Sequence, residues 1–88
     1  MPDVDVVFRR PARDFYDNTA TTTERLSFNA IIAEICASPA ADGLRRYRMN
    51  SGNDVLYHDG RFWILYRPLN NWTIELLGLG TVLDRSDD

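Results

Sequence analysis

Apolar and aromatic residues are densest in two runs near the end of the chain, Phe62–Tyr66 and Trp72–Leu79. The interruption between them, Pro68–Asn71, is made of turn-forming residues, so the pattern predicts two strands of an antiparallel hairpin. Each run has large side chains on both faces, which is typical of central strands covered on both sides. We therefore expect this hairpin to form the middle of the core.

The first part of the chain predicts a strand followed by a short helix. Val4–Phe8 alternates apolar and polar residues, as a short strand does. Pro11 suits the first turn of a helix, because its missing N–H has no partner there. Ala12–Asp17 can supply one or two helical turns, and Asn18–Thr23 is predicted to be a connector.

A second, longer helix is predicted from residue 21 to residue 38. Thr21 and Glu24 have the spacing of a capping box, and Pro39 disfavours helical geometry in Ser38. An apolar stripe toward the core is formed by Phe28, Ile31, Ile32 and Ile35. The opposite side has a flatter surface, which we expect to receive the first helix; it comprises Leu26, Ala30, Ala33 and Ala37.

The region between this helix and the hairpin is less periodic. Leu44–Met49 predicts either a loop or a short edge strand with its arginines outward, whereas Asp54–His58 predicts a strand. Asp59-Gly60 is a strong hairpin signal into Arg61. The predicted fold is a single α+β domain of order β-α-α-β-β-β, with a mostly antiparallel sheet, a helical hairpin on one face and a short acidic tail at residues 84–88.

Length and composition fit one domain with a real core. The 88 residues are 44% hydrophobic, and the single cysteine cannot form an internal disulfide, which suits a reducing compartment. The sequence contains no apolar run long enough to span a membrane and does not begin like a signal sequence. A cytoplasmic protein without membrane contact is expected.

The basic residues are all arginines, and the net charge of −3 argues against avid, nonspecific nucleic-acid binding. Half of the arginines nevertheless fall between residues 43 and 67, where only Asp54 and Asp59 oppose them. These arginines form either one basic patch or scattered surface charges; they are Arg45, Arg46, Arg48, Arg61 and Arg67. If they converge, they can bind phosphate oxygens bidentately.

Other candidate chemistry is sparse. His58 is the only histidine and is expected at a solvated turn, unless a partner and a pocket make it a general base. Cys36 lies beside the apolar stripe and is expected to pack as a small hydrophobic residue. With one histidine and one cysteine, the sequence predicts neither a zinc site nor a cofactor.

The element order and three short segments resemble the RelE/ParE superfamily of bacterial toxins. Gly60–Arg67, followed by Trp72–Gly80, is similar to that family's final hairpin. Pro11–Phe15 is similar to the opening of its first helix, and Ile35–Pro39 to the close of its second. The resemblance implies a toxin of a type II toxin–antitoxin module, a cognate antitoxin and a bacterial source.

The resemblance also implies two mechanistic classes, one cleaving mRNA on the ribosome with basic residues and one poisoning DNA gyrase without them. The nuclease class implies Arg61, Arg67, Arg48 and His58 as catalytic residues, and Arg45, Arg46 and Tyr66 as binding residues. This sequence departs from the nuclease pattern at Asp54–Tyr57 and at Gly80–Val82, where basic residues are expected. We therefore expect a toxin-like protein that binds gyrase or the ribosome; the alternatives are an mRNA endoribonuclease and a non-catalytic regulatory module, which is expected to form a homodimer.

Overall fold

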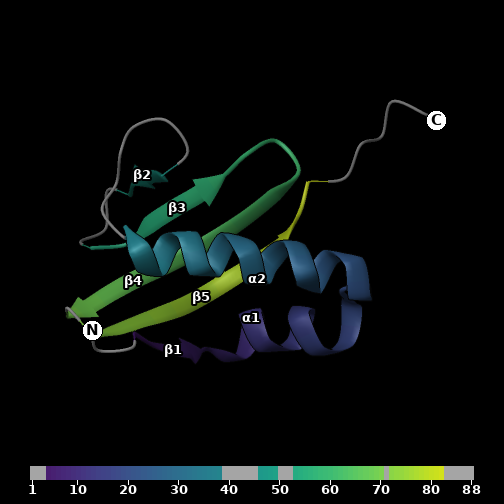
Figure 1. The fold of residues 1–88 in the computed structure, drawn as a ribbon, viewed down its shortest axis with the longest axis horizontal. Coiled ribbons are helices and arrows are strands. Elements are labelled where there is room, and N and C mark those ends of the chain that lie inside the picture. Colours follow the sequence, from purple (N-terminus) through teal and green to yellow (C-terminus); the bar gives the residue numbers. More distant parts are fainter. Residues whose placement is uncertain (1–3, 39–45, 50–52, 71, 83–88) are drawn as a thin grey trace.

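The computed structural model describes residues 4–38, 46–49, 53–70 and 72–82, which fold as five strands with helices between the first and the second (Figure 1). Arg45 and the predicted acidic tail lie outside the described residues. The elements are β1 (Asp5–Phe8), α1 (Arg10–Asp14), the π-helical turn η1 (Phe15–Thr19), α2 (Thr22–Ala37), β2 (Arg46–Arg48), β3 (Val55–His58), β4 (Phe62–Asn70) and β5 (Thr73–Thr81).

The strands form one sheet in the order β1-β5-β4-β3-β2. β1 pairs with β5 in parallel, and every other neighbouring pair is antiparallel. The predicted α+β fold with a mostly antiparallel sheet is therefore confirmed, and β4 lies at its centre as expected. Because β1 joins the edge beside β5, the first strand of the chain pairs with the last.

The hairpin strands are longer than predicted, because Pro68, Leu69 and Asn70 belong to β4 and not to a turn. Pro68 pairs with Ile74 of β5, while the pairing of β3 with β4 ends at Tyr66. The other edge of β4 therefore has no β3 partner at Pro68. A proline can occupy a strand at such a place, since no ladder hydrogen bond needs its missing N–H.

An irregularity in β5 sets which side chains face the core. The register shifts between Leu65 and Tyr66, which pair with Gly78 and Leu76 respectively, so Leu77 is an extra residue. This β-bulge lets Leu76 and Leu79 both face the core although they are three residues apart. The residues on either side of the bulge that face away from the core are Glu75, Gly78 and Gly80.

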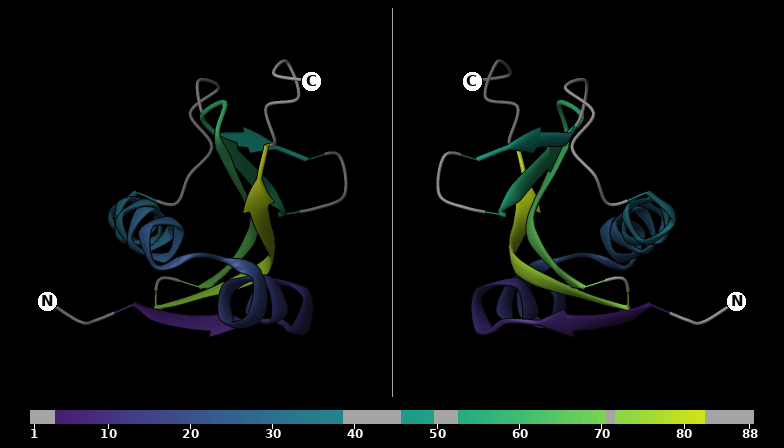
Figure 2. Two further views of the ribbon diagram at one scale, coloured as in Figure 1. Left: turned by 90° about the vertical axis from the view of Figure 1, so that its right-hand side faces the viewer. Right: turned by 90° about the vertical axis from the view of Figure 1, so that its left-hand side faces the viewer.

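α2 lies across one face of the sheet, as the two side views show (Figure 2). Its capping box is present: the Thr21 hydroxyl accepts a hydrogen bond from the Glu24 N–H at 3.1 Å, and the Glu24 carboxylate accepts one from the Thr21 N–H at 2.9 Å. Phe28, Ile31 and Ile35 of the predicted stripe are buried against the sheet, and Ile32 is half-buried. Among the described residues a helix covers this face of the sheet alone, which agrees with the predicted fold; the cover on both sides that the large side chains of the hairpin suggested is not seen there.

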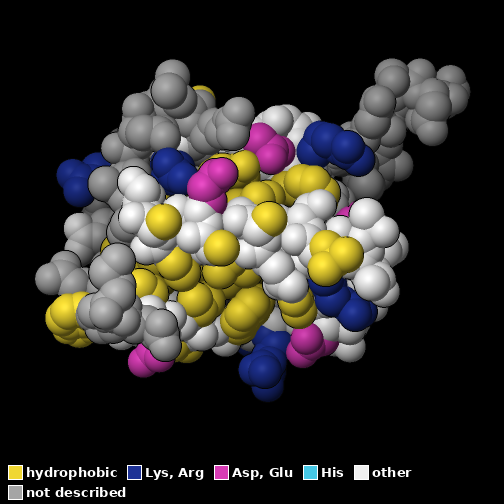
Figure 3. All heavy atoms as spheres, in the orientation of Figure 1, with side chains coloured by type: hydrophobic (Ala, Val, Ile, Leu, Met, Phe, Trp, Pro, Cys, Tyr) yellow, Lys and Arg dark blue, Asp and Glu magenta, His cyan; other side chains and the backbone are white. Residues whose placement is uncertain are grey.

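The first helix meets α2 through a different side from the one predicted. The Tyr16 hydroxyl donates to the Asn29 side-chain oxygen at 2.8 Å, and Arg25 Nε donates to the Tyr16 carbonyl at 3.0 Å. The Leu26, Ala30, Ala33 and Ala37 side of α2 is exposed instead, and apolar atoms are visible along the outward side of this helix (Figure 3). α1 packs against β5, whose pairing with β1 ends at Leu76, and the buried Ala12 joins the core there.

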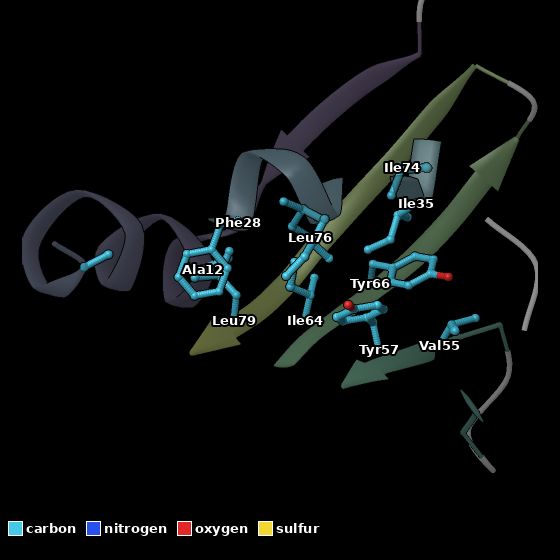
Figure 4. Packing of buried hydrophobic residues seen from close by; sticks show 12 residues of the cluster. Ala12, Phe28, Ile35, Val55, Tyr57, Ile64, Tyr66, Ile74, Leu76 and Leu79 are labelled. Atoms are coloured by element: carbon cyan, nitrogen blue, oxygen red, sulfur yellow. The ribbon is translucent and has the colours of Figure 1, made fainter. Parts of the chain in front are cut away.

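The core lies between α2 and the sheet (Figure 4). Phe28 connects three elements, because its ring makes edge contacts with Phe15 of η1 and Phe62 of β4, at centroid distances of 6.1 and 5.2 Å. The largest fully buried side chains are Tyr66, Phe28, Ile35, Ile64, Ile74 and Leu76. No helix formed by the described residues is long and apolar enough to cross a membrane.

Candidate functional site: the open face of the sheet

The face of the sheet opposite α2 carries a row of charged side chains and a group of aromatic ones. Alternation along each strand places these side chains on one side, because cross-strand partners share a face. We call this surface the open face; it comprises Tyr47, Asp54, Leu56, His58, Trp63, Leu65, Arg67, Glu75, Gly78 and Gly80.

A row of four alternating charges crosses the open face. Arg9, directly after β1, pairs with Glu75 of β5 through Nη1 and Oε2 at 3.1 Å. Arg67 of β4 approaches the other Glu75 oxygen at 3.8 Å and binds Asp54, which precedes β3, with Nε–Oδ1 at 2.6 Å and Nη2–Oδ2 at 3.3 Å. The row therefore joins four neighbouring strands or their ends, and its formal charges cancel.

The two carboxylates of this row are much less exposed than the two guanidinium groups. The side chains of Asp54 and Glu75 are 11% and 13% exposed, against 44% for Arg67 and 59% for Arg9. The hydrogen bond to Asp54 and the charge of that carboxylate raise the pKa of Arg67 above its usual value. A buried carboxylate that loses its partner is strongly destabilised, so Asp54 keeps the Arg67 donors occupied.

Aromatic side chains occupy the part of the open face near the β3–β4 turn. Tyr47 of β2 stacks on His58 of β3 with ring centroids 5.0 Å apart and an interplanar angle of 20°. Trp63, the cross-strand partner of His58, extends over Gly78 and Gly80 of β5. A Cβ atom at Gly80 would lie 2.8 Å from Trp63 Nε1, so glycine is required where the indole approaches the backbone.

The structure does not bring Arg61 and Arg67 together. Arg61 lies in the turn before β4, with its guanidinium 5.8 Å from the Phe62 ring centroid. Arg67 lies toward the other end of the strand, about 20 Å away at the usual rise per residue of a strand. One phosphate group cannot bind both.

The remaining predicted site residues are also dispersed. Arg48 is exposed at the end of β2 and faces the α2 side with Arg46. Arg46 was predicted outward, but its side chain is 12% exposed and pairs with Glu34 of α2 at 3.5 Å. Tyr66 is fully buried in the core, so its ring is not available to a partner, and His58 is exposed beside the turn as expected.

Sequence reasoning missed Asp54 and Glu75 as members of the site. Asp54 was counted only as one of two acids opposing the arginines, but as a residue it is only 8% exposed. The signal was available in the pairing register: Val55 opposite Tyr66 places Asp54 beside Arg67 on the same face. That register follows from the turn that joins β3 to β4, which pairs His58 with Trp63.

Other chemistry is limited in the part of the chain that the structure describes. No group of three or more histidine, cysteine, aspartate or glutamate side chains there is placed to hold a metal ion. Burial raises the pKa of the half-buried Cys36 thiol, which packs against the core as expected. The open face, with its charge row and its aromatic end, is therefore the candidate functional site.

Comparison with known proteins identifies the fold. No protein-family model and no curated protein sequence matches the chain. The isolated E. coli RelE toxin is similar in structure, with a TM-score of 0.73 at 11% identity, over 96% of this chain and 89% of that one. The RelBE2 toxin–antitoxin complex of Mycobacterium tuberculosis gives 0.70 at 15% identity, over 96% and 97%.

The intact E. coli RelBE toxin–antitoxin complex gives a TM-score of 0.58 at 12% identity, over 92% of this chain and 99% of that one. The alignments cover nearly the whole of both chains in each case. The resemblance inferred from the element order and the final hairpin is therefore confirmed at the level of the fold, and this chain is a divergent domain of the RelE fold.

Proposed function

We propose that this protein is the toxin-like component of a type II toxin–antitoxin module, acting in the cytoplasm of a bacterium by binding its target. The fold that it shares with RelE toxins supports the module. Binding is favoured over cleavage because the candidate arginines are held in ion pairs or lie far apart. Arg67 is committed to Asp54 and Glu75, Arg46 to Glu34, and Arg61 lies at the far end of β4.

Of the two targets that the resemblance implies, this arrangement favours DNA gyrase over the ribosome. Cleavage of a phosphodiester needs several donors placed around one phosphate, because charge develops on its oxygens in the transition state. The described residues hold no such converged set. A target bound through protein surface has no such requirement.

An antitoxin is the second expected partner. Several large apolar side chains are at least half exposed, among them Leu26 at 64%, Trp72 at 52% and Leu69 at 50%. A small domain with such surface gains stability when a partner binds only its folded state. We expect the protein encoded beside this one to bind it and to restore growth.

The test is induced expression in a bacterial host, followed by two assays with the purified chain. We expect growth arrest that the neighbouring gene relieves, inhibition of DNA supercoiling by purified gyrase, and intact mRNA in a translation extract. Harmless expression with a stable homodimer by light scattering would instead support the regulatory module. Growth arrest with mRNA cleavage that Arg61→Ala and Arg67→Ala abolish would support the endoribonuclease.

A further inference from the structure

The charge row on the open face limits which ligands can bind to this face. Arg67 is the arginine nearest the middle of the sheet, and its guanidinium is 44% exposed, so its position alone would suit a phosphate. Two of its nitrogens are nevertheless bound to the two oxygens of Asp54. A phosphate that used the same bidentate geometry would have to displace a carboxylate that is itself almost buried.

We propose that Asp54 and Glu75 are specificity-determining residues that exclude polyanions, and nucleic acid in particular, from the open face. This inference rests on the proposed function and narrows its target class to one that is not bound through a phosphate backbone. Glu75 acts on two arginines, because one of its oxygens faces Arg67 and the other faces Arg9.

Two properties of the row support a role in excluding anions, in addition to holding the strands together. The acids are the less exposed members, so they cannot turn toward solvent and release the arginines when an anion approaches. The arginines are the more exposed members, so removing the acids leaves cations at the surface, where they can meet a ligand.

The test is RNA binding by the full chain carrying Asp54→Asn and Glu75→Gln together. These changes keep side-chain shape, remove two negative charges and free Arg67 and Arg9. The probe is a fluorescently labelled single-stranded oligouridylate, and binding is followed by anisotropy over a series of salt concentrations. We expect at least a tenfold tighter Kd than for the parent at low salt, and a steeper salt dependence because additional phosphate contacts form.

The matched control carries Asp17→Asn and Glu34→Gln, which removes the same charge and takes one carboxylate partner from each of two arginines, Arg13 and Arg46, away from the open face. The control is expected to bind RNA less than threefold tighter than the parent. Adding both Arg67→Ala and Arg9→Ala to the Asp54→Asn/Glu75→Gln variant is expected to return its Kd to that of the control. Equal gains in the two double variants, or a gain that survives both alanine changes, would overturn the proposal.

If circular dichroism shows that the double variant is unfolded, RNA binding is measured with Glu75→Gln alone. It leaves Asp54 bound to Arg67 and frees only Arg9, so a smaller gain is expected, and Arg9→Ala should remove it. No gain over Glu34→Gln alone would reject the proposal. Growth arrest is measured separately, so a failed proposed function and a failed exclusion give different results.

Discussion

At the scale of single residues, the Trp63 ring lies against two glycines of β5. The indole spans Gly78 and Gly80, and the space for a Cβ differs between them. At Gly80 a Cβ would meet the rigid ring atoms Nε1, Cε2 and Cζ2 at 2.8 to 3.0 Å, whereas at Gly78 the nearest ring atom is 3.3 Å away. The two positions therefore form a natural comparison.

We predict that Gly80→Ala destabilises the protein by about 1–3 kcal/mol, because the indole must move out of its place against the strand. Urea denaturation measures the free energy of unfolding. Gly78→Ala is the control and should cost less. In the Trp63→Ala background, Gly80→Ala should lower the free energy of unfolding much less. An unchanged loss there would show that the ring is not responsible.

Cys36 gives a pH-dependent prediction at the same scale. Burial raises the pKa of its thiol, so the folded state favours the neutral form. Stability is then fully present below the unfolded pKa of about 8.5 and falls as pH rises through the higher folded value.

We expect iodoacetamide to alkylate Cys36 more slowly in the native protein than in urea at pH 8, because the thiolate is the reactive form. The native rate should continue to rise above pH 9, where the unfolded rate levels off. Mass spectrometry of timed samples measures both rates. Equal rates at pH 8 would contradict the assignment of a buried, raised-pKa thiol.

At the scale of elements, α2 begins where its capping box places it. Thr21 and Glu24 each satisfy a backbone N–H of the other, which stabilises the first turn through local contacts. We predict that Thr21→Ala lowers the free energy of unfolding by about 1 kcal/mol. Thr23→Ala, two residues into the exposed first turn, is the control and should leave stability nearly unchanged; equal effects would mean that the cap contributes nothing.

The elements that could be predicted from the sequence are those determined by local chemistry. The cap of α2, its apolar stripe and the Asp59-Gly60 turn depend on neighbouring residues, and the structure has them. The predicted order β-α-α-β-β-β lacks one strand, because the weakly periodic segment that contains β2 was left open as a loop or an edge strand. The prediction of which side of α2 contacts the first helix was wrong, because alanines tolerate exposure as well as close packing. Only the position of η1 beside Phe28 and Asn29 decides which side of α2 is used.

The candidate site was predicted less well, because it depends on register and not on composition. Arg67 was identified, but its partners Asp54 and Glu75 come from two other strands and were not. Asp54 is placed by the register of β3 with β4, and Glu75 by the register of β4 with β5 and its bulge at Leu77. No single segment encodes these registers, so the sequence left open whether the arginines form one patch or scattered charges.

At the scale of the whole molecule, one side chain joins the helical layer to the sheet. Phe28 is fully buried and contacts aromatic rings of η1 and β4. We predict that Phe28→Ala costs about 3–5 kcal/mol, a large share of the 5–15 kcal/mol typical of a domain. Thermal and urea unfolding measure the loss. Leu26→Ala, on the exposed side of the same helix, should change stability by less than about 0.5 kcal/mol, and a similar loss for both would contradict this division of α2.

The parallel pairing of β1 with β5 governs when the molecule can assemble. The residues that face each other in this pair, such as Asp5 and Thr73, lie near opposite ends of the sequence. Contacts of such long sequence separation slow folding, because the loop must close before they stabilise it. During synthesis, β1 and α1 emerge before β5 has been translated, so we expect their apolar residues to stay exposed until the last strand is made.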